Sequence, residues 1–158
     1  MNKKVGIIAL IALFIDQISK IIIELLIAYN NSITIIKKFF SITTVHNYGV
    51  SWGMLSGKRI IIMILSILTM IFIYHISKSY KDNIRNNIAF GLLIGGMFGN
   101  FLDRLILGYV RDFLDFYIFK YNYPVFNIAD ICIVVGILLL IIATLKGEDE
   151  SDNKKRKE

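Results

Sequence analysis

The sequence is poor in the residues that form disulfides, metal sites and rigid turns. It has one cysteine, two histidines and one proline among 158 residues. Cys132 cannot form a disulfide within the chain, and in an apolar run it is expected to be a small packing residue. There is no His-Glu-x-x-His motif, so no helical zinc site is indicated, and no metal or organic cofactor is expected. The sequence is instead rich in hydrophobic residues, which make up 56% of it.

Four long apolar segments dominate the chain, and each approaches the ~20 residues that a helix needs to cross a membrane. A retained first helix is predicted over a cleaved signal peptide, because the first apolar run resumes after Lys20 and no cleavage site is evident. We predict one integral-membrane domain over residues 1–146, and a charged tail over 147–158 that is expected to be disordered. The segments are 5–28, 60–76, 87–107 and 128–145.

The positive charge is distributed as in a membrane protein, and no nucleic-acid partner is expected. The formal net charge is +6, and ten of the 18 Lys and Arg residues lie in 3–4, 78–85 and 146–157. Four spans place both termini and the loop between the second and third spans on one side of the membrane. The excess of positive charge there predicts that this side is cytoplasmic.

The two connections on the opposite side have the composition of strands. Residues 32–45 are dense in β-branched and aromatic types, and residues 116–126 are rich in aromatics and contain Pro124. Aromatic side chains also suit a membrane interface. The sequence therefore predicts an all-α polytopic membrane protein, with four transmembrane helices and a small β-rich extracytoplasmic platform.

The third span carries glycines and polar residues at a spacing of four, which keeps them on one helical face. Glycines allow neighbouring helices to approach closely in a membrane. Helix packing does not explain the polar residues, which lie in the last third of the span. One stripe is Gly91, Gly95, Gly99 and Asp103, and the adjacent stripe is Gly96, Asn100 and Arg104.

Polar residues of three spans are predicted to meet in the outer half of the membrane. The outer end of the third span lies level with Asn127 and Asp130, at the start of the fourth. Asp16 and Lys20 in the first span are four residues apart and can form an ion pair. A charged acid at the bilayer centre costs about 2.5–3.5 kcal/mol, so such residues usually have a function.

Asp112 and Asp130 are the candidate catalytic pair. Asp112 follows the third span closely and can fold back toward Asp130. Two acids at close range cannot both be ionised, so one keeps a proton. The ionised acid can then activate water while the other donates a proton, as in aspartic proteases. Asp115 is a competitor for Asp112 if this stretch is helical.

Other functions are less well supported by the residues. A Ser–Lys catalytic pair of Ser51 and Lys58 would lie outside the membrane, but no buried environment supports it. A cysteine nucleophile needs a nearby histidine, and Cys132 has no evident one. His46 and His75 are predicted at opposite membrane faces, which argues against a histidine-based zinc site. The alternative to an enzyme is a small transport or assembly protein, since transporters also use paired acids. The absence of polar residues leading to the inner side argues against transport.

Five short segments occur in order along nearly the whole chain. Together they resemble the motifs of bacterial lipoprotein signal peptidases, also called signal peptidase II, although each one alone is weak. Ser19, Val50 and Ser51 depart slightly from the usual family residues. The segments are Asp16-Gln17-Ile18-Ser19-Lys20, Asn47-Tyr48-Gly49-Val50-Ser51-Trp52-Gly53, Gly99-Asn100-Phe101-Leu102-Asp103-Arg104, Val110-Arg111-Asp112-Phe113 and Phe126-Asn127-Ile128-Ala129-Asp130.

The resemblance implies an aspartyl endopeptidase of the bacterial inner membrane. Such an enzyme removes the signal peptide of a prolipoprotein, cutting before a diacylglyceryl-modified cysteine. The implied partners are these substrates, membrane lipid and inhibitors of the globomycin type, and a monomer is expected. The implied roles are catalytic for Asp112 and Asp130, substrate-binding for Asn47, Asn100, Arg104 and Asn127, and supporting for Asp16, Lys20, Gly49, Trp52, Gly99 and Asp103. The loop with Gly49 and Trp52 could act as a lid, although Trp52 equally suits an interfacial anchor.

Overall fold

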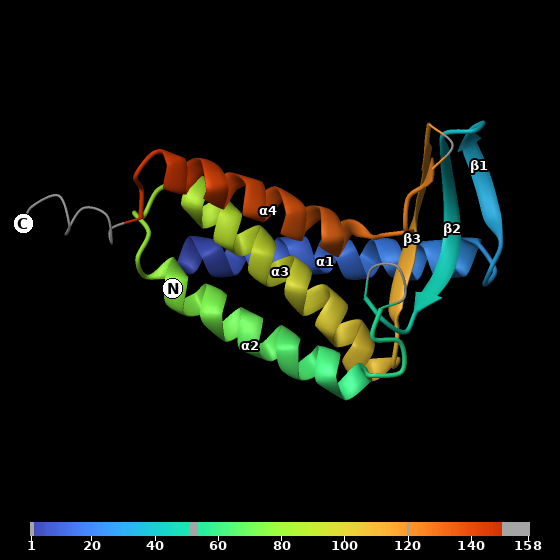
Figure 1. Ribbon diagram of the computed structural model, residues 1–158, viewed down its shortest axis with the longest axis horizontal. Helices are drawn as coiled ribbons and strands as arrows, with labels where there is room; N and C mark the ends of the chain where they lie inside the picture. Colours follow the sequence, from blue (N-terminus) through green and yellow to red (C-terminus); the bar gives the residue numbers. More distant parts are fainter. Residues whose placement is uncertain (1, 51–53, 120, 150–158) are drawn as a thin grey trace, which may run out of the picture.

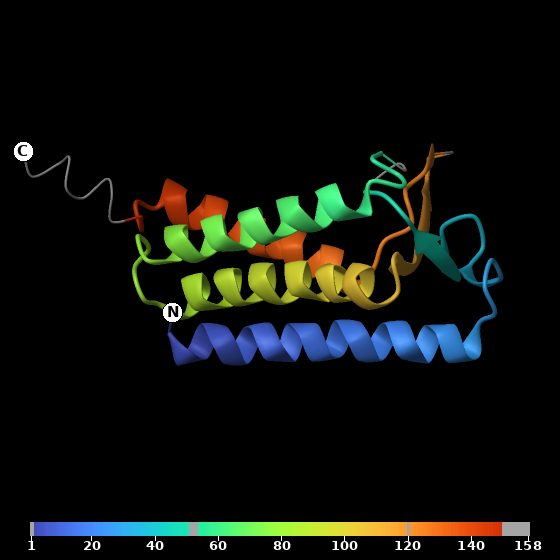
Figure 2. The same cartoon turned by 90° about the horizontal axis from the view of Figure 1, so that it is seen from below.

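The computed structural model describes residues 2–50, 54–119 and 121–149. Within these residues four helices run side by side, and a sheet stands across one end of them (Figure 1). The N-terminus and the end of the last helix lie together at the other end (Figures 1 and 2). All four helices are long and apolar enough to cross a membrane, as predicted. They are α1 (Lys3–Leu26), α2 (Arg59–Ser77), α3 (Ile84–Ile106) and α4 (Ile128–Leu145).

The helix ends differ from the predicted ones where polar capping overrides the hydropathy pattern. α3 begins three residues before the predicted start because Asn83 is its N-cap, and its side chain accepts a hydrogen bond from the backbone N–H of Asn86 at 2.9 Å. α1 ends two residues early. Its C-cap Ile27 is extended, and the Ile27 carbonyl accepts a hydrogen bond from Thr44 Oγ1 at 3.0 Å. The sheet therefore determines where the first helix stops.

α3 is the central helix, and it packs against the other three. Half of its most apolar 18-residue stretch is buried, a larger share than in any other span. The outer helices expose large apolar side chains, such as Leu10, Phe14 and Leu25 of α1, which are 67%, 67% and 79% exposed. In a bilayer these side chains face lipid, which is as apolar as they are.

The glycines of α3 allow the helices to approach closely, as their spacing predicts. A Cβ atom added at Gly95 would lie 2.6 Å from the backbone oxygen of Ala9 in α1. A Cβ at Gly99 would collide with the Asp16 carboxylate. The glycine stripe that lets α1 approach α3 therefore also places Asp16, a polar residue of α1, against α3.

Among the described residues the sheet has four antiparallel strands, in the order β1 (Ser32–Ile36), β2 (Phe40–Asn47), β3 (Val110–Ile118) and β4 (Tyr121–Asn122). The predicted platform is confirmed, but β3 begins six residues before the aromatic-rich segment that indicated a strand. Asp112 consequently lies inside a strand of the sheet. Next to it the β2–β3 register shifts, because Thr43 and Thr44 together lie opposite Phe113. Such bulges bend the sheet locally.

Replacing Gly95 with alanine should lower the thermal stability of the protein in detergent micelles. The new methyl group would meet the α1 backbone, and overpacking of this kind costs about 1–3 kcal/mol. Gly6→Ala is the matched control, since nothing lies within 4 Å of its added Cβ and alanine favours a helix. Equal melting temperatures for the two variants would contradict this packing.

Candidate active site

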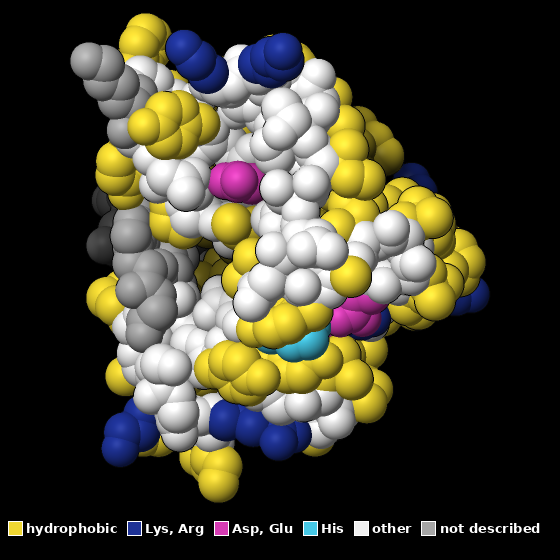
Figure 3. All heavy atoms as spheres, turned by 90° about the vertical axis from the view of Figure 1, so that its right-hand side faces the viewer, with side chains coloured by type: hydrophobic (Ala, Val, Ile, Leu, Met, Phe, Trp, Pro, Cys, Tyr) yellow, Lys and Arg dark blue, Asp and Glu magenta, His cyan; other side chains and the backbone are white. Residues whose placement is uncertain are grey.

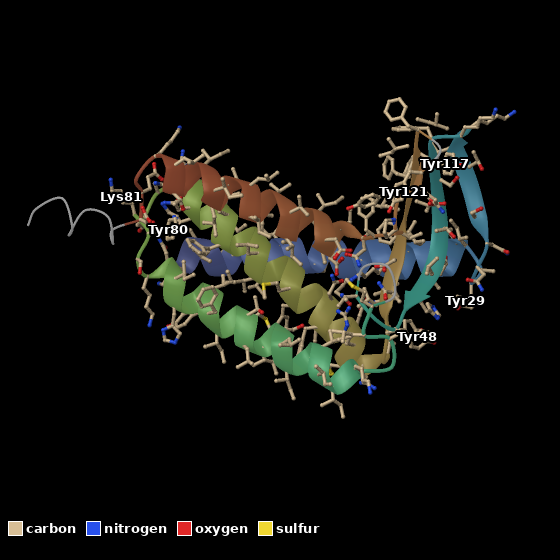
Figure 4. All side chains as sticks on the ribbon, in the orientation of Figure 1. Tyr29, Tyr48, Tyr80, Lys81, Tyr117 and Tyr121 are labelled. Carbon is tan, nitrogen blue, oxygen red and sulfur yellow. The ribbon has the colours of Figure 1, made fainter. Side chains whose placement is uncertain are left out.

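A cavity of about 1060 Å³ lies where the sheet meets the helices. Its walls come from β2, β3, α2, α3 and α4, and nitrogen and oxygen atoms gather at this level of the molecule (Figure 4). Most of the residues predicted for substrate binding and catalysis line it. These are Asn47, Asn100, Arg104, Asp112 and Asp130, together with Gly49.

Asp112 is 3% exposed and is held by two side-chain amides. Asn47 Nδ2 donates to its Oδ2 at 2.9 Å, and Asn127 Nδ2 donates to its Oδ1 at 2.6 Å. Burial, and then repulsion from the Asp130 carboxylate, raise the pKa of Asp112 to about 7. The hydrogen bonds from Asn47 and Asn127 oppose this shift without cancelling it. Asp112 can therefore carry a proton near neutral pH.

Asp130 is oriented by the start of α4. Asn127 is the N-cap and forms a capping box with Asp130, in which each side chain accepts a hydrogen bond from the backbone N–H of the other residue. Asn100 Nδ2 of α3 donates to Asp130 Oδ1 at 2.8 Å. The carboxyl group is thus fixed by backbone geometry and by a neighbouring helix.

Asn127 links the two acids. It is fully buried, and it contacts Asp112 through its side chain and Asp130 through its backbone and side chain. It was predicted to bind substrate, but it is not among the described residues that line the cavity. Its amide is used internally, also donating to Asn100 Oδ1 at 3.0 Å. Its place is behind the two acids, where it fixes their relative position.

Arg104 reaches from α3 to the loop after β2. Its Nη2 donates to the Gly49 carbonyl at 2.7 Å, and its Nη1 donates to the Asn100 carbonyl at 3.2 Å. The side chain is buried and lines the cavity. Arg104 therefore holds Gly49, which follows β2, against the helix bundle.

A layer of ion pairs lies beside the cavity and joins three helices. Lys20 and Asp16 are both fully buried, with Lys20 Nζ 2.8 Å from Asp16 Oδ2 and 3.2 Å from Asp103 Oδ2. Asp16 Oδ1 accepts a hydrogen bond from the backbone N–H of Ala129 in α4 at 2.9 Å. Lys20 also donates to Asn100 Oδ1 at 3.0 Å. The predicted pair of Asp16 and Lys20 is confirmed, and Asp103 completes it.

The sequence reasoning missed the residues that connect this layer to the sheet. Arg111 is 2.6 Å from Asp103 and also contacts Glu24 of α1. Glu24 in turn pairs with His46 at 3.1 Å. Figure 3 shows a histidine beside an acidic side chain among hydrophobic side chains on the outer face of the sheet. Glu24 could have been found, because it continues the four-residue spacing of Asp16 and Lys20.

Asp115 does not compete with Asp112 in this structure. The stretch is a strand, so residues an odd number apart point to opposite faces. Asp115 is paired with Ser41 in the register and is not among the described cavity residues. Trp52 and Ser51 lie outside the described residues, as does most of the predicted tail. Within the described ranges, no three His, Cys, Asp or Glu side chains are grouped to hold a metal ion.

Comparison with known proteins gives a consistent result. The family profile of "Signal peptidase (SPase) II" matches residues 8–146. The chain belongs to this family. The lipoprotein signal peptidases of Staphylococcus aureus strains JH9 and Newman are 41% identical to it, across 100% of this chain and 99% of theirs.

Solved structures agree with the family assignment. A bacterial membrane enzyme determined by the in meso method at 2.3 Å resolution has a TM-score of 0.81 and 39% identity. That match covers 98% of this chain and 93% of the other. A second such structure, at 1.9 Å resolution, has a TM-score of 0.78 and the same identity, with 90% and 92% covered. As a member of the signal peptidase II family, this chain is therefore a peptidase with several membrane-spanning helices. A transport or assembly protein is not favoured.

Replacing Lys20 with methionine should destabilise the protein strongly. It leaves the buried Asp16 and Asp103 without their shared cation, and breaking a buried pair costs about 3–5 kcal/mol. Arg85→Met is the matched control, because Arg85 pairs with Glu148 at the opposite end and is partly exposed. Thermal unfolding in detergent measures both variants. A loss for Lys20→Met no larger than that for Arg85→Met would contradict a structural role for Lys20.

Proposed function

We propose that this chain removes signal peptides from prolipoproteins as an aspartic endopeptidase, with Asp112 and Asp130 as its catalytic pair. The observation that carries the proposal is how these two acids are held. Both lie on the wall of one large cavity and are bonded by amides, and within the described residues neither forms a salt bridge. A neutral amide brings no positive charge, so burial and the Asp130 carboxylate still raise the pKa of Asp112, whereas a cation in contact with an acid favours its ionised form.

The reaction requires one proton to be shared by the pair. The ionised acid takes a proton from a water molecule as that water attacks the scissile carbonyl carbon. The protonated acid donates its proton to the carbonyl oxygen as the tetrahedral diol forms. The acid that took the water proton then donates it to the leaving amine as the C–N bond breaks, and the other acid recovers a proton from a diol hydroxyl. Asn127 keeps the two carboxyl groups in a fixed relative position during this proton exchange, because it forms hydrogen bonds with both of them.

The other polar residues of the cavity are suited to an extended peptide. Asn47, Asn100 and Arg104 present amide and guanidinium groups beside the two acids. Asn100 is oriented by Lys20 and donates to Asp130, so it links the ion-pair layer to the reacting groups. We propose that these three residues bind the substrate backbone around the cleavage point. The substrate-binding residues are in turn supported by residues around them, which are Asp16, Lys20, Gly49, Gly99 and Asp103.

An apolar extension of the cavity suits the membrane-embedded part of the substrate. A second cavity of about 300 Å³ shares Ile62, Met97 and Ile133 with the first and continues between α2, α3 and α4. Its lining is mostly aliphatic, with Ser66 and Thr69 as the polar residues. We propose that the apolar signal helix and the acyl chains of a diacylglyceryl-modified cysteine lie along it, so that cleavage occurs just before that cysteine.

The distribution of charge orients the protein in the bacterial cell membrane. Figure 4 shows Tyr29, Tyr48, Tyr117 and Tyr121 at the platform end of the molecule. Lys81 and Tyr80 lie at the opposite end. Positively charged loops face the cytoplasm, so both termini are inside and the cavity opens at the outer surface. All groups in the proposed mechanism come from one chain, which fits a monomer. A globomycin-type cyclic peptide inhibitor would occupy the same cavity as the substrate.

Replacing either catalytic aspartate with asparagine should abolish cleavage of a diacylated prolipoprotein. Loss of the acid–base pair is expected to reduce the rate by about 10³-fold or more. Asp115→Asn should cleave normally, because it removes a carboxyl group from the same strand but from its other face. The measurement is the shift of the substrate band with purified protein in lipid. Cleavage that persists in folded Asp112→Asn would overturn the assignment.

The cleavage rate should fall as the pH rises through about 7. Because the pKa of Asp112 is raised, the shared proton is held below that pH and is lost above it. With both acids ionised no group can donate to the carbonyl oxygen. Initial rates at saturating substrate, measured between about pH 5 and pH 9, test this. A rate that stays constant across the range would show that no group of the pair loses a proton there.

A further inference from the structure

Arg111 lies beside Asp112 on β3 but on the opposite face of the strand. Alternate residues of a strand point to opposite sides. Accordingly, Asp112 lines the cavity, whereas Arg111 is not among the described lining residues. Arg111 is 8% exposed, and a guanidinium group buried to this extent must be paired. Its partners are on the helices, so it joins the strand to the bundle.

Asp103 at the outer end of α3 binds Arg111 through three donors. The backbone N–H of Arg111 donates to Asp103 Oδ2 at 3.0 Å, its Nε donates to the same oxygen at 3.3 Å, and its Nη2 donates to Asp103 Oδ1 at 2.6 Å. The planar guanidinium matches a carboxylate in this two-point arrangement, which lysine cannot reproduce. The contact therefore fixes both the side chain and the backbone next to Asp112.

Two residues of α1 extend this attachment. Arg111 Nη2 donates to Gln17 Oε1 at 2.8 Å, and its Nη1 lies 3.5 Å from Glu24 Oε2. On its other side, the Arg111 carbonyl accepts a hydrogen bond from Asn127 Nδ2 at 3.4 Å. One residue thus connects β3 to α1 and α3, and to the N-cap of α4 that positions Asp130.

The attachment lies next to an irregularity in the sheet, although Arg111 and Asp112 are themselves paired with His46 and Val45 of β2. Between the pairs Val45–Asp112 and Ile42–Leu114, two β2 residues oppose one β3 residue. The regular ladder is interrupted immediately after Asp112, so β2 alone does not determine the position of its carboxyl group. Asn47 of β2 holds the carboxyl group directly, and contacts from the helix side add to this through Asn127 at the carboxyl group and Arg111 at the neighbouring backbone.

We propose that Arg111 is a positioning residue for cleavage, which holds the backbone of Asp112 at the correct distance from Asp130. The inference rests on the proposed catalytic role of these two aspartates. Arg111 is not among the described residues that line the cavity, so it should affect turnover and not substrate binding. A misplacement of about 1 Å in a reacting group can cost on the order of 100-fold in rate.

The test compares Arg111→Lys and Arg111→Met with wild type on a diacylated prolipoprotein, using purified full-length protein in lipid. We expect kcat to fall about 10- to 100-fold in Arg111→Met and less in Arg111→Lys, with KM within about twofold of wild type. Arg111→Lys keeps the charge and one contact with Asp103, so it keeps the fold if the methionine variant does not. Arg85→Met is the matched control for removal of an ion-paired arginine far from the cavity.

Three outcomes overturn the inference. A kcat within about threefold of wild type in both Arg111 variants would show that the attachment does not position Asp112. A rise in KM with unchanged kcat would show that Arg111 contributes to substrate binding instead. Asp112→Asn is assayed alongside, and if it remains active, the proposed catalytic pair fails and the role of Arg111 fails with it. If Asp112→Asn is inactive, failure of the Arg111 prediction concerns Arg111 alone.

Discussion

The polar part of this molecule depends on one buried cation, Lys20. An ammonium group inside an apolar bundle is tolerated only when opposite charges and acceptors surround it, and Asp16, Asp103 and Asn100 do so here. Because these partners come from α1 and α3, and Asp16 also bonds to α4, the pairing fixes three helices at one depth. The glycines of α3 are required for the same reason, since short ion-pair distances need helices that nearly touch.

Five acids at or beside the cavity fall into two groups with different partners. Asp16, Asp103 and Glu24 are paired with the basic side chains of Lys20, Arg111 or His46. Asp112 and Asp130 are bonded by asparagine amides and the backbone, which carry no positive charge, so burial and repulsion between the two acids still raise the pKa of Asp112. Asn100 and Asn127 separate the groups physically. Environments that differ in this way are how enzymes assign different tasks to identical side chains.

Sequence reasoning succeeded where a single physical rule decides. Hydropathy located four spans. The alternating direction of these spans and the four-residue spacing of their polar residues predicted that Asp16, Asn100 and Asp130 lie toward the same end. It was less successful where tertiary contacts compete with local pattern. Strand β3 was expected only from residue 116, because Asp112 and Asp115 interrupt its apolar alternation. Asn127 was expected to face substrate, yet it bonds to both acids.

The amino-acid sequence by itself determined the membrane-spanning architecture, the family, and which acids gather toward one end of the helix bundle. These depend on hydrophobicity, spacing and motif order, which are properties of the chain alone. Only the tertiary structure decided that Arg111 and Glu24 belong to the polar layer, and that Asp115 faces away from the cavity. The reason is that a buried charge is stabilised by partners distant in the sequence, and strand pairing determines which face each side chain takes.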